Sequence, residues 1–382
     1  MARFAPRPDR RLLSVLVIAG LLAILASGCR GRLGPASVRM TRTDYNVAAQ
    51  ETSAQELLLN LVRLRYRDTP YFLQIASLST NMKATAGLTG QGSFLTPGAD
   101  AGLLTGSVAI EESPTVTYTP IVGDRFVSEL LEPVEPGILL LLSHAGWSID
   151  RFFRLLVQEA NGVANAPTAS GPTPDLEPVY TDFLRASELL RVLQSRRQIA
   201  LIRGALDATG RELAINADAP AKSGVLLRLT PDALGTSEHR ELASLLGLDP
   251  SRTLFELVQG IGAHSPHRIN LVLRSVLSAM FYASHGIAVP DEDREAGRVT
   301  TTRTTAGEPF DWHRLTGTLL RVETGRPPIR PYTAVRYRGH LFWIDDADRE
   351  SKSTFSMLDL VIALKSGDVP TTGPILTLPV AK

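Results

Sequence analysis

The sequence contains a single cysteine, at position 29. A chain with one thiol cannot form an intramolecular disulfide, a CxxC redox site, or a zinc or iron–sulfur site with several cysteine ligands. Three enzyme signatures are also missing: the GxSxG of α/β-hydrolases, the P-loop of nucleotide triphosphatases and the HExxH of zinc proteases. The sequence therefore gives no local motif for these three enzyme classes, and we predict no catalytic residue.

The chain also lacks an excess of charge of either sign. It has 40 Lys and Arg against 39 Asp and Glu, a formal net charge of +1. Without a basic field the composition argues against a dedicated nucleic-acid-binding protein. Hydrophobic residues make up 44% of the 382 positions, which is enough apolar surface to fold two ordinary domains or one large one.

The first 28 residues have the parts of a secretory signal peptide. Four arginines lie among the first 11 residues, an uncharged, mostly aliphatic run follows at 12–25, and small residues come next. At about 1.5 Å per residue this run is about 21 Å long as a helix, which is shorter than the roughly 30 Å hydrocarbon core of a bilayer. The pattern therefore favours a signal peptide over a permanent transmembrane helix.

The residues Ala26-Ser27-Gly28-Cys29 resemble the lipobox of bacterial lipoproteins. The resemblance implies that the Cys29 sulfur carries a diacylglyceryl group, that the chain is cleaved before it, and that a further acyl chain such as palmitate is added to the new amino terminus. Arg30 stands where an Asp would imply retention in the inner membrane. We therefore expect a protein held at the cell outer membrane by its lipids and facing the periplasm.

Composition divides the remaining chain into four parts. Residues 29–43 contain several Arg and Gly and no acid and predict a flexible basic tether, and the Pro- and Gly-rich residues 166–178 predict a linker. The linker separates an N-terminal α+β region at 44–165 from a C-terminal α+β region at 179–382. Helices and strands occur in runs without repeated βαβ units, which predicts an α+β fold of mixed helices with antiparallel sheet.

Periodicity predicts the individual elements. Leu57, Leu61 and Leu64 recur at helical spacing within a helix at about 45–66, which Asp68-Thr69-Pro70 should end. Further along, the pattern predicts helices at 180–194 and 253–258, a strand at 315–322, a hairpin of strands at 333–337 and 340–344 joined at Arg338-Gly339, and a closing strand at 374–380.

Residues 71–120 are rich in Gly, Ser and Thr and carry few charges. Polar and apolar residues alternate here, which predicts a long β-hairpin with its turn at 96–100. Each arm exceeds the roughly 9–11 residues with which a strand crosses a bilayer. Two interpretations remain open: a soluble sheet packed on the protein's own helices, or hairpins of several protomers joined in an oligomeric ring or pore.

Several segments resemble an uncharacterised family of proteobacterial outer-membrane lipoproteins. They are Asp44-Tyr45-Asn46, the run from Leu57 to Asp68, Thr115-Val116-Thr117-Tyr118-Thr119-Pro120, Tyr337-Arg338-Gly339, Asp345-Asp346 and Ser351-Lys352-Ser353-Thr354-Phe355. Together they extend along the whole mature chain. The resemblance implies location and continuity of fold, and it implies no catalytic residue.

An acidic cluster follows the hairpin at 333–344. Asp346, Asp348 and Glu350 match the first three ligand positions of a calcium loop, but Ser351 and Met357 stand where that loop needs Gly and Glu. The alternative is a turn in which the carboxylates cap the next helix. We predict no metal and no cofactor, and keep these three residues as weak metal candidates.

Arg63, Arg65 and Arg67 form a basic triplet near the end of the first helix. They could bind an anionic polymer or lipid, or they could form a solvated, ion-paired face.

The sequence favours a non-enzymatic, lipid-anchored envelope protein with a structural or partner-binding role on the periplasmic side of the outer membrane. Its expected partners are the membrane, through the anchor, and an envelope protein, which includes a second copy of the chain; nucleic acid is not among them. Two alternatives remain: a component of an oligomeric export or pore complex that contributes a β-hairpin, and a periplasmic hydrolase that acts on an envelope polymer.

Overall fold

The computed structural model describes residues 33–91, 103–120, 124–207, 210–213, 224–263, 265–366 and 376–379. The predicted signal peptide, Cys29, Arg30 and the predicted turn at 96–100 lie outside these residues. The chain divides into two compact units, with the boundary between Glu56 and Leu57. None of the helices in the described residues has the length and apolar character that a membrane-spanning helix needs.

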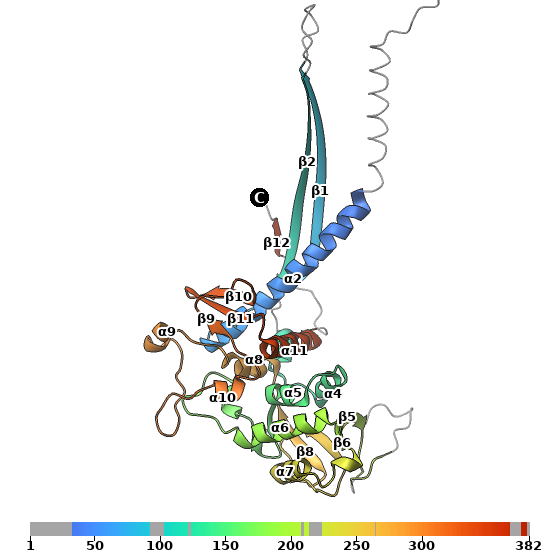
Figure 1. Ribbon diagram of the computed structural model, residues 1–382, viewed down its shortest axis with the longest axis vertical. Coiled ribbons are helices and arrows are strands. Elements are labelled where there is room, and N and C mark those ends of the chain that lie inside the picture. The colour runs from blue at the N-terminus through green and yellow to red at the C-terminus, as the bar shows by residue number, and fades with distance from the viewer. Residues whose placement is uncertain are drawn as a thin grey trace, which may run out of the picture. The chain divides into compact units, whose positions relative to one another are not determined.

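The element labels are those of Figure 1. The helices are α2 (Leu33–Arg65), α3 (Asp124–Leu131), α4 (Pro136–His144), α5 (Ile149–Leu156), α6 (Thr181–Ser195), α7 (Ser237–Leu246), α8 (Val276–Ser284), α9 (Asp291–Glu295), α10 (His313–Thr316) and α11 (Arg349–Ser366), with short 3₁₀ turns η1 (Pro167–Ser170) and η3 (Pro231–Ala233). The strands are β1 (Leu73–Gln91), β2 (Leu103–Pro120), β3 (Val157–Ala160), β4 (Val163–Ala164), β5 (Ile199–Gly204), β6 (Gly224–Leu229), β7 (Leu254–Gln259), β8 (Arg268–Leu273), β9 (Glu323–Thr324), β10 (Pro331–Tyr337), β11 (His340–Asp345) and β12 (Leu376–Pro379).

The described strands form three sheets. The largest has the order β4-β3-β8-β7-β6-β5 and is antiparallel except for the pair β7–β8. The other two are antiparallel, with the orders β1-β2-β12 and β10-β11-β9. Helices and strands therefore occur together without βαβ repeats, which confirms the predicted α+β class.

Helices cover the six-stranded sheet and form its core with it. The helices α4 and α6 pack on β5, and α5 packs on α6 (Figure 1). On α6 the residues Phe183, Leu190 and Leu193, which the sequence places on one stripe, are all buried. In β8 buried and partly exposed residues alternate, as expected of a strand with one face on a core.

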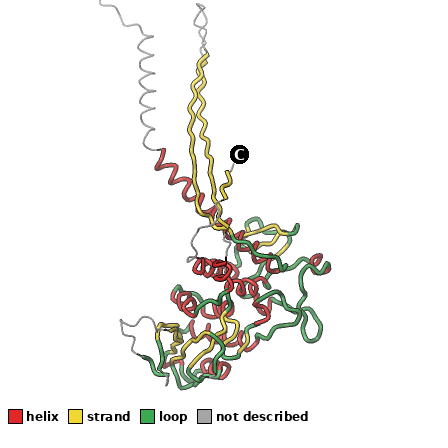
Figure 2. The backbone as a smooth tube through the Cα atoms, turned by 180° about the vertical axis from the view of Figure 1, so that it is seen from behind, coloured by secondary structure: helices red, strands yellow, loops and turns green. Residues whose placement is uncertain are grey.

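The strands β1 and β2 pair along their whole length, from Leu73 opposite Pro120 to Gln91 opposite Leu103. The register shifts once, between Ile75 and Ser77, where Ala76 forms a bulge. Figure 2 shows the two strands side by side and the short β12 next to β2. Because β12 pairs with Thr115–Tyr118 alone, the rest of β2 and the outer edge of β1 have no further strand beside them in the described part of the chain.

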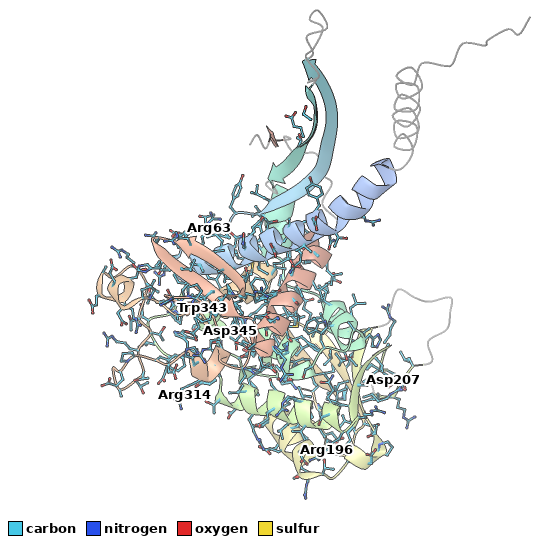
Figure 3. The ribbon with its side chains drawn as sticks, turned by 45° about the horizontal axis from the view of Figure 1, so that its top comes forward. Arg63, Arg196, Asp207, Arg314, Trp343 and Asp345 are labelled. Carbon is cyan, nitrogen blue, oxygen red and sulfur yellow. The ribbon has the colours of Figure 1, made fainter. Side chains whose placement is uncertain are left out.

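The C-terminal end of α2 joins the β10–β11 sheet. The ring of Tyr66 packs edge-on against those of Tyr337 and Phe342, with centroids 5.6 Å and 6.2 Å away. Figure 3 shows this part of the molecule, with Arg63 on α2 and Trp343 on β11. The turn between β10 and β11 is Arg338-Gly339, and both residues have positive φ, as a two-residue hairpin turn requires.

Two predicted elements are wrong. Residues 253–258 form most of strand β7 rather than a helix, because Phe255 and Leu257 are buried on alternate positions between β6 and β8. The predicted strand at 315–322 begins instead with the last turn of α10. Its buried residues do not alternate with exposed ones, since they are Leu315, Thr316, Leu319, Leu320 and Val322.

Two boundaries also differ from the sequence-based division. Helix α2 begins at Leu33, so part of the predicted tether is helical; Pro35 fits there because the first helical turn needs no intrahelical N–H donors. Residues 166–178 lie within the unit that starts at Leu57, and Ala169 and Thr173 in this segment are buried. The small residues that resemble a linker composition allow the close packing of this segment.

A buried arginine holds the junction where α5 continues directly into β3. The Arg274 side chain is 1% exposed, and its guanidinium donates to the carbonyls of Arg154 (3.0 Å), Leu155 (3.2 Å) and Val157 (2.8 Å), and to that of Asn165. It also lies 4.0 Å above the ring of Tyr282. Burial lowers the pKa of Arg274 to about 10, so the group stays charged at neutral pH and complements the negative end of the α5 dipole.

We predict that Arg274→Met lowers the free energy of unfolding by about 3 kcal/mol or more, because several buried carbonyls lose their donor. Arg268→Met on the same strand is the control: its side chain is 43% exposed and pairs with Glu256, and exposed pairs contribute about 1 kcal/mol or less. Urea unfolding of both variants measures the difference. Equal destabilisation would contradict a special role for Arg274.

Candidate functional site

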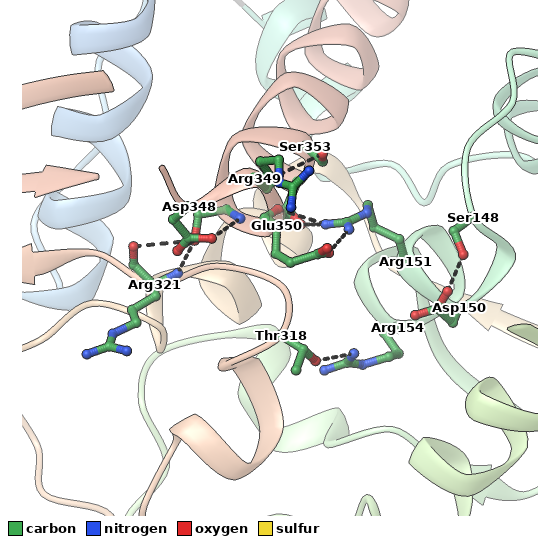
Figure 4. A network of polar contacts seen from close by, with 12 residues as sticks. Ser148, Asp150, Arg151, Arg154, Thr318, Arg321, Asp348, Arg349, Glu350 and Ser353 are labelled. Carbon is green, nitrogen blue, oxygen red and sulfur yellow. Dashed lines mark hydrogen bonds and ion pairs between the residues drawn. The ribbon is translucent and has the colours of Figure 1, made fainter. Parts of the chain in front are cut away.

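The acidic cluster after β11 is divided among separate partners. Asp346 pairs with Lys352 at 2.6 Å, and Glu350 pairs with Arg151. Figure 4 shows Glu350 facing Arg151, while Asp348 lies at the start of α11 beside Arg321. In the described residues no group of three His, Cys, Asp or Glu side chains is placed to hold a metal ion. The structure thus does not bring Asp346, Asp348 and Glu350 together around a common point.

Asp348 precedes α11 and caps it. One carboxylate oxygen accepts the backbone N–H of Ser351 at 3.0 Å, and the other accepts the Ser351 hydroxyl at 2.6 Å. The Ser351 hydroxyl oxygen in turn accepts the backbone N–H of Arg321 at 2.8 Å. This arrangement is the capping alternative that the sequence left open, and it ties the helix to the segment before β9.

A cavity of about 520 Å³ lies close to this cluster. It is lined by charged residues of both signs, among them Asp150, Arg154, Glu188 and Glu350. Arg154 is already used, because it donates to the Leu315 carbonyl at 2.7 Å and to the Thr318 hydroxyl at 2.8 Å. The mixture of charges gives this cavity no preference for an anion or a cation.

The basic triplet at the end of α2 separates into three environments. Arg63 donates to the side chain of Asn60 at 3.1 Å, and Arg67 donates to the Thr173 carbonyl at 2.9 Å. Arg65 is buried and donates to the Thr173 hydroxyl at 2.8 Å. Of the three predicted binding residues, Arg65 belongs to the lining of a second cavity.

That cavity, which we call the Arg65 pocket, has a volume of about 290 Å³. It lies between the end of α2, the segment that follows α8 and the segment before α10, and we define it by Arg65, His285, Arg294, Thr300, Thr301 and Trp312. Phe310 and Val289 add apolar surface, and Asp311 is an exposed acid in its lining.

Arg65 is 7% exposed, and no Asp or Glu in the described part of the chain forms an ion pair with it. Burial and, to a smaller extent, the nearby positive charge of Arg294 lower the pKa of Arg65 to about 10. Its Nε atom has no hydrogen-bond acceptor among the described residues. A buried cation with an unfilled donor is stabilised by an anion that approaches it.

The buried carboxylate of Asp293 is committed elsewhere. Asp293 is fully buried, accepts the hydroxyl of Tyr66 and pairs with Arg298 at 2.5 Å. Burial alone would raise the pKa of Asp293, but these hydrogen bonds outweigh it and hold the pKa below its usual value. Asp293 therefore stays ionised and holds α9 against the end of α2.

His285 lies beside Arg65 in the pocket and is neutral. Its ring stacks on Trp312 with centroids 4.0 Å apart, and its Nε2 lies 3.2 Å from the Ala169 carbonyl. Burial and the charge of Arg65 lower the pKa of His285 well below its usual value. Nε2 therefore carries the proton, and Nδ1 is an acceptor that has no donor among the described residues.

The sequence indicated Arg65 through the basic triplet, but it gave no sign of His285, Arg294 or Trp312. These residues lie more than 200 positions from Arg65, and no short motif connects them. Comparisons with protein-family models, with curated proteins and with solved structures each find no match to this chain.

We expect Asp348→Ala to lower the free energy of unfolding by about 1 kcal/mol, the usual loss when a helix cap is removed. Asp346→Ala removes an exposed ion pair and should cost less than about 0.5 kcal/mol. Urea unfolding with and without added Ca²⁺ measures both effects. Stabilisation of the wild-type protein by Ca²⁺ that both variants lose would instead support the calcium-loop interpretation.

Proposed function

We propose that this chain is a lipid-anchored protein of the bacterial outer membrane that faces the periplasm and acts by assembling with protein partners. The anchor is the acylated Cys29 at the end of the signal-like segment. The observation that carries the assembly role is the β1–β2 hairpin, whose long edges have little further strand pairing in the described residues. Such edges bind added strands readily.

The hairpin register separates apolar from polar positions. Residues that alternate along paired strands share a face, so each register pair can be assigned to one of two faces. One face holds Leu73, Ile75, Leu78, Met82, Ala84, Ala86, Leu88, Leu104, Val108, Ile110, Val116 and Tyr118, with Thr80, Gly90, Gly106, Glu112, Pro114 and Pro120. The other face holds Gln74, Ser77, Ser79, Asn81, Lys83, Thr85, Thr89, Gln91, Thr105, Ser107, Glu111, Ser113, Thr115, Thr117 and Thr119, with Gly87, Leu103 and Ala109.

The charges of the strands β1 and β2 are confined to their middle. Lys83 stands opposite Glu111 on the polar face, and Glu112 follows on the other face. Beyond them the arms 84–91 and 103–110 contain no charged residue. This distal part has eight residues in each arm, close to the roughly 9–11 residues with which a strand crosses a bilayer.

This distribution favours a second candidate function, in which hairpins from several copies join edge to edge in an oligomeric export or pore complex. In that arrangement the uncharged distal arms enter the membrane, because neighbouring hairpins satisfy their open edges. The apolar face then meets lipid, and the polar face lines the interior. The hydrolase alternative has no such support, because the acidic cluster in the described residues consists of a cap and two ion pairs.

We predict that Val108→Asp reduces the assembled fraction at least tenfold, because it places a charge on the apolar face of the distal hairpin, where a charge at the bilayer centre costs a few kcal/mol. Ser107→Asp is the matched control: it adds the same charge one residue away, on the polar face. Light scattering of the detergent-extracted protein measures its size, and reconstituted vesicles report conductance.

The size and conductance measurements separate the two candidate functions. An oligomer that conducts ions supports the pore, whereas an oligomer without conductance supports assembly alone. A wild-type protein that is monomeric after mild extraction, and that cross-links to no other envelope protein in cells, contradicts both.

The anchor is tested by replacing its sulfur. We expect Cys29→Ala to abolish labelling by a tagged fatty acid and to prevent the protein from sedimenting with outer membranes. Arg30→Asp is the control that keeps the sulfur: the lipoprotein resemblance implies that it remains labelled but moves to the inner membrane. Recovery of the unaltered chain in the cytosol, unlabelled and with residues 1–28 still attached, would contradict the proposal.

A further inference from the structure

The Arg65 pocket has features of a ligand site that the proposed assembly role does not use. It contains a buried arginine without a carboxylate partner in the described chain, and a second arginine that lines the same cavity. Structural arginines usually have acceptors for their donor groups, as Arg274 has here. Arg65 has one side-chain acceptor, Thr173, and its Nε has none.

Arg294 provides further donors at the same cavity. One terminal nitrogen of Arg294 makes the contacts with the Val289 carbonyl (3.0 Å) and with Asp291 (2.8 Å). Arg294 is half exposed, so its guanidinium can be reached from solvent. Because Arg65 and Arg294 repel each other, an anion between them would be attracted by both.

The number of donors favours a phosphoryl group over a carboxylate. Besides the two arginines, Thr300 and Thr301, which each carry a hydroxyl group, belong to the same lining. Together these donors exceed what the two oxygens of a carboxylate can accept in one plane, whereas a phosphate monoester presents three terminal oxygens in a tetrahedral arrangement. Arginine is also the side chain best suited to bind phosphate through paired N–H groups.

The rest of the lining suits a ligand that carries hydroxyl groups next to its phosphate. The Nδ1 atom of His285 is a buried acceptor without a donor among the described residues, and a ligand hydroxyl can supply one. Asp311 is a second acceptor in the lining and would disfavour a ligand with negative charge on that side. Val289 and Phe310 offer apolar contact, and a cavity of about 290 Å³ holds a small molecule or a headgroup.

We propose that the Arg65 pocket binds a phosphate monoester, with the phosphoryl group between Arg65 and Arg294 and an adjacent ligand hydroxyl on His285. The same chemistry occurs in a free sugar or glycerol phosphate and in a phospholipid whose headgroup is a phosphate monoester. The pocket lies outside the hairpin and the anchor, so this proposal and the assembly role can fail independently.

The test is calorimetric titration of the full-length protein in detergent. The probes are glycerol 3-phosphate, its carboxylate counterpart glycerate, and short-chain phosphatidic acid used below its critical micelle concentration. We expect saturable binding of a phosphate probe at least tenfold tighter than that of glycerate. Glycerol 3-phosphate as the tighter phosphate probe indicates a free metabolite, and phosphatidic acid as the tighter one indicates a lipid.

Variants connect the binding to the pocket. Arg294→Gln should weaken the phosphate probe at least tenfold, since it removes a charged donor from an exposed side chain without disturbing the core. Arg326→Gln removes the same charge from an exposed position outside the pocket and should leave binding unchanged. Arg65→Gln should also weaken binding, and urea unfolding of this variant checks whether the loss of its bond to Thr173 has altered the fold.

Three results would overturn the proposal. They are the absence of saturable binding for both phosphate probes, binding of glycerate within tenfold of the tighter phosphate probe, and an Arg294→Gln variant that binds that probe like the wild-type protein.

Discussion

The interaction on which the fold depends most is the contact between the Arg274 guanidinium and the carbonyls at the α5–β3 junction. A helix that continues straight into a strand leaves its last carbonyls without partners, and here they lie in the core, where water cannot satisfy them. Arg274 replaces water with a single rigid group, and Asn165 donates to two of the same carbonyls. The junction in turn fixes β3 against β8 and places α5 on α6.

Much of this fold could be predicted from local sequence patterns, because several elements carry both a clear periodicity and a signal for where they end. The end of α2, the helix α6 and the hairpin turn at Arg338-Gly339 each combine a clear period with a stop or turn signal. Strand β7 could not be predicted, since its burial depends on β6 and β8, which come from other parts of the chain. Residues 166–178 resemble a linker in composition alone; their burial is a tertiary effect.

In the candidate site, too, local patterns could be predicted and tertiary contacts could not. Three arginines at alternate positions are equivalent in the sequence, and the fold distinguishes them: one meets a side-chain amide, one a backbone carbonyl, and one is buried beside a histidine that lies 220 positions further along. In the acidic cluster, the helix cap could be predicted from the sequence, because a carboxylate just before a helical pattern commonly caps the helix. The ion pairs of Glu350 with Arg151 and of Asp346 with Lys352 could not be predicted, because they depend on where the fold places α5 and the first turn of α11.

The extra residue at Ala76 has a consequence for the whole β1–β2 pair. Leu73 and Ile75 are odd-numbered, whereas the apolar positions from Leu78 onwards are even-numbered, so an unbroken strand would split them between opposite sides. The bulge adds one residue to β1 and shifts its alternation by one position. The apolar positions before and after Ala76 therefore fall on the same face in the register. One alanine therefore sets which face of β1 each residue occupies. Deleting a single residue at this position would move every residue on one side of the deletion to the opposite face of the strand.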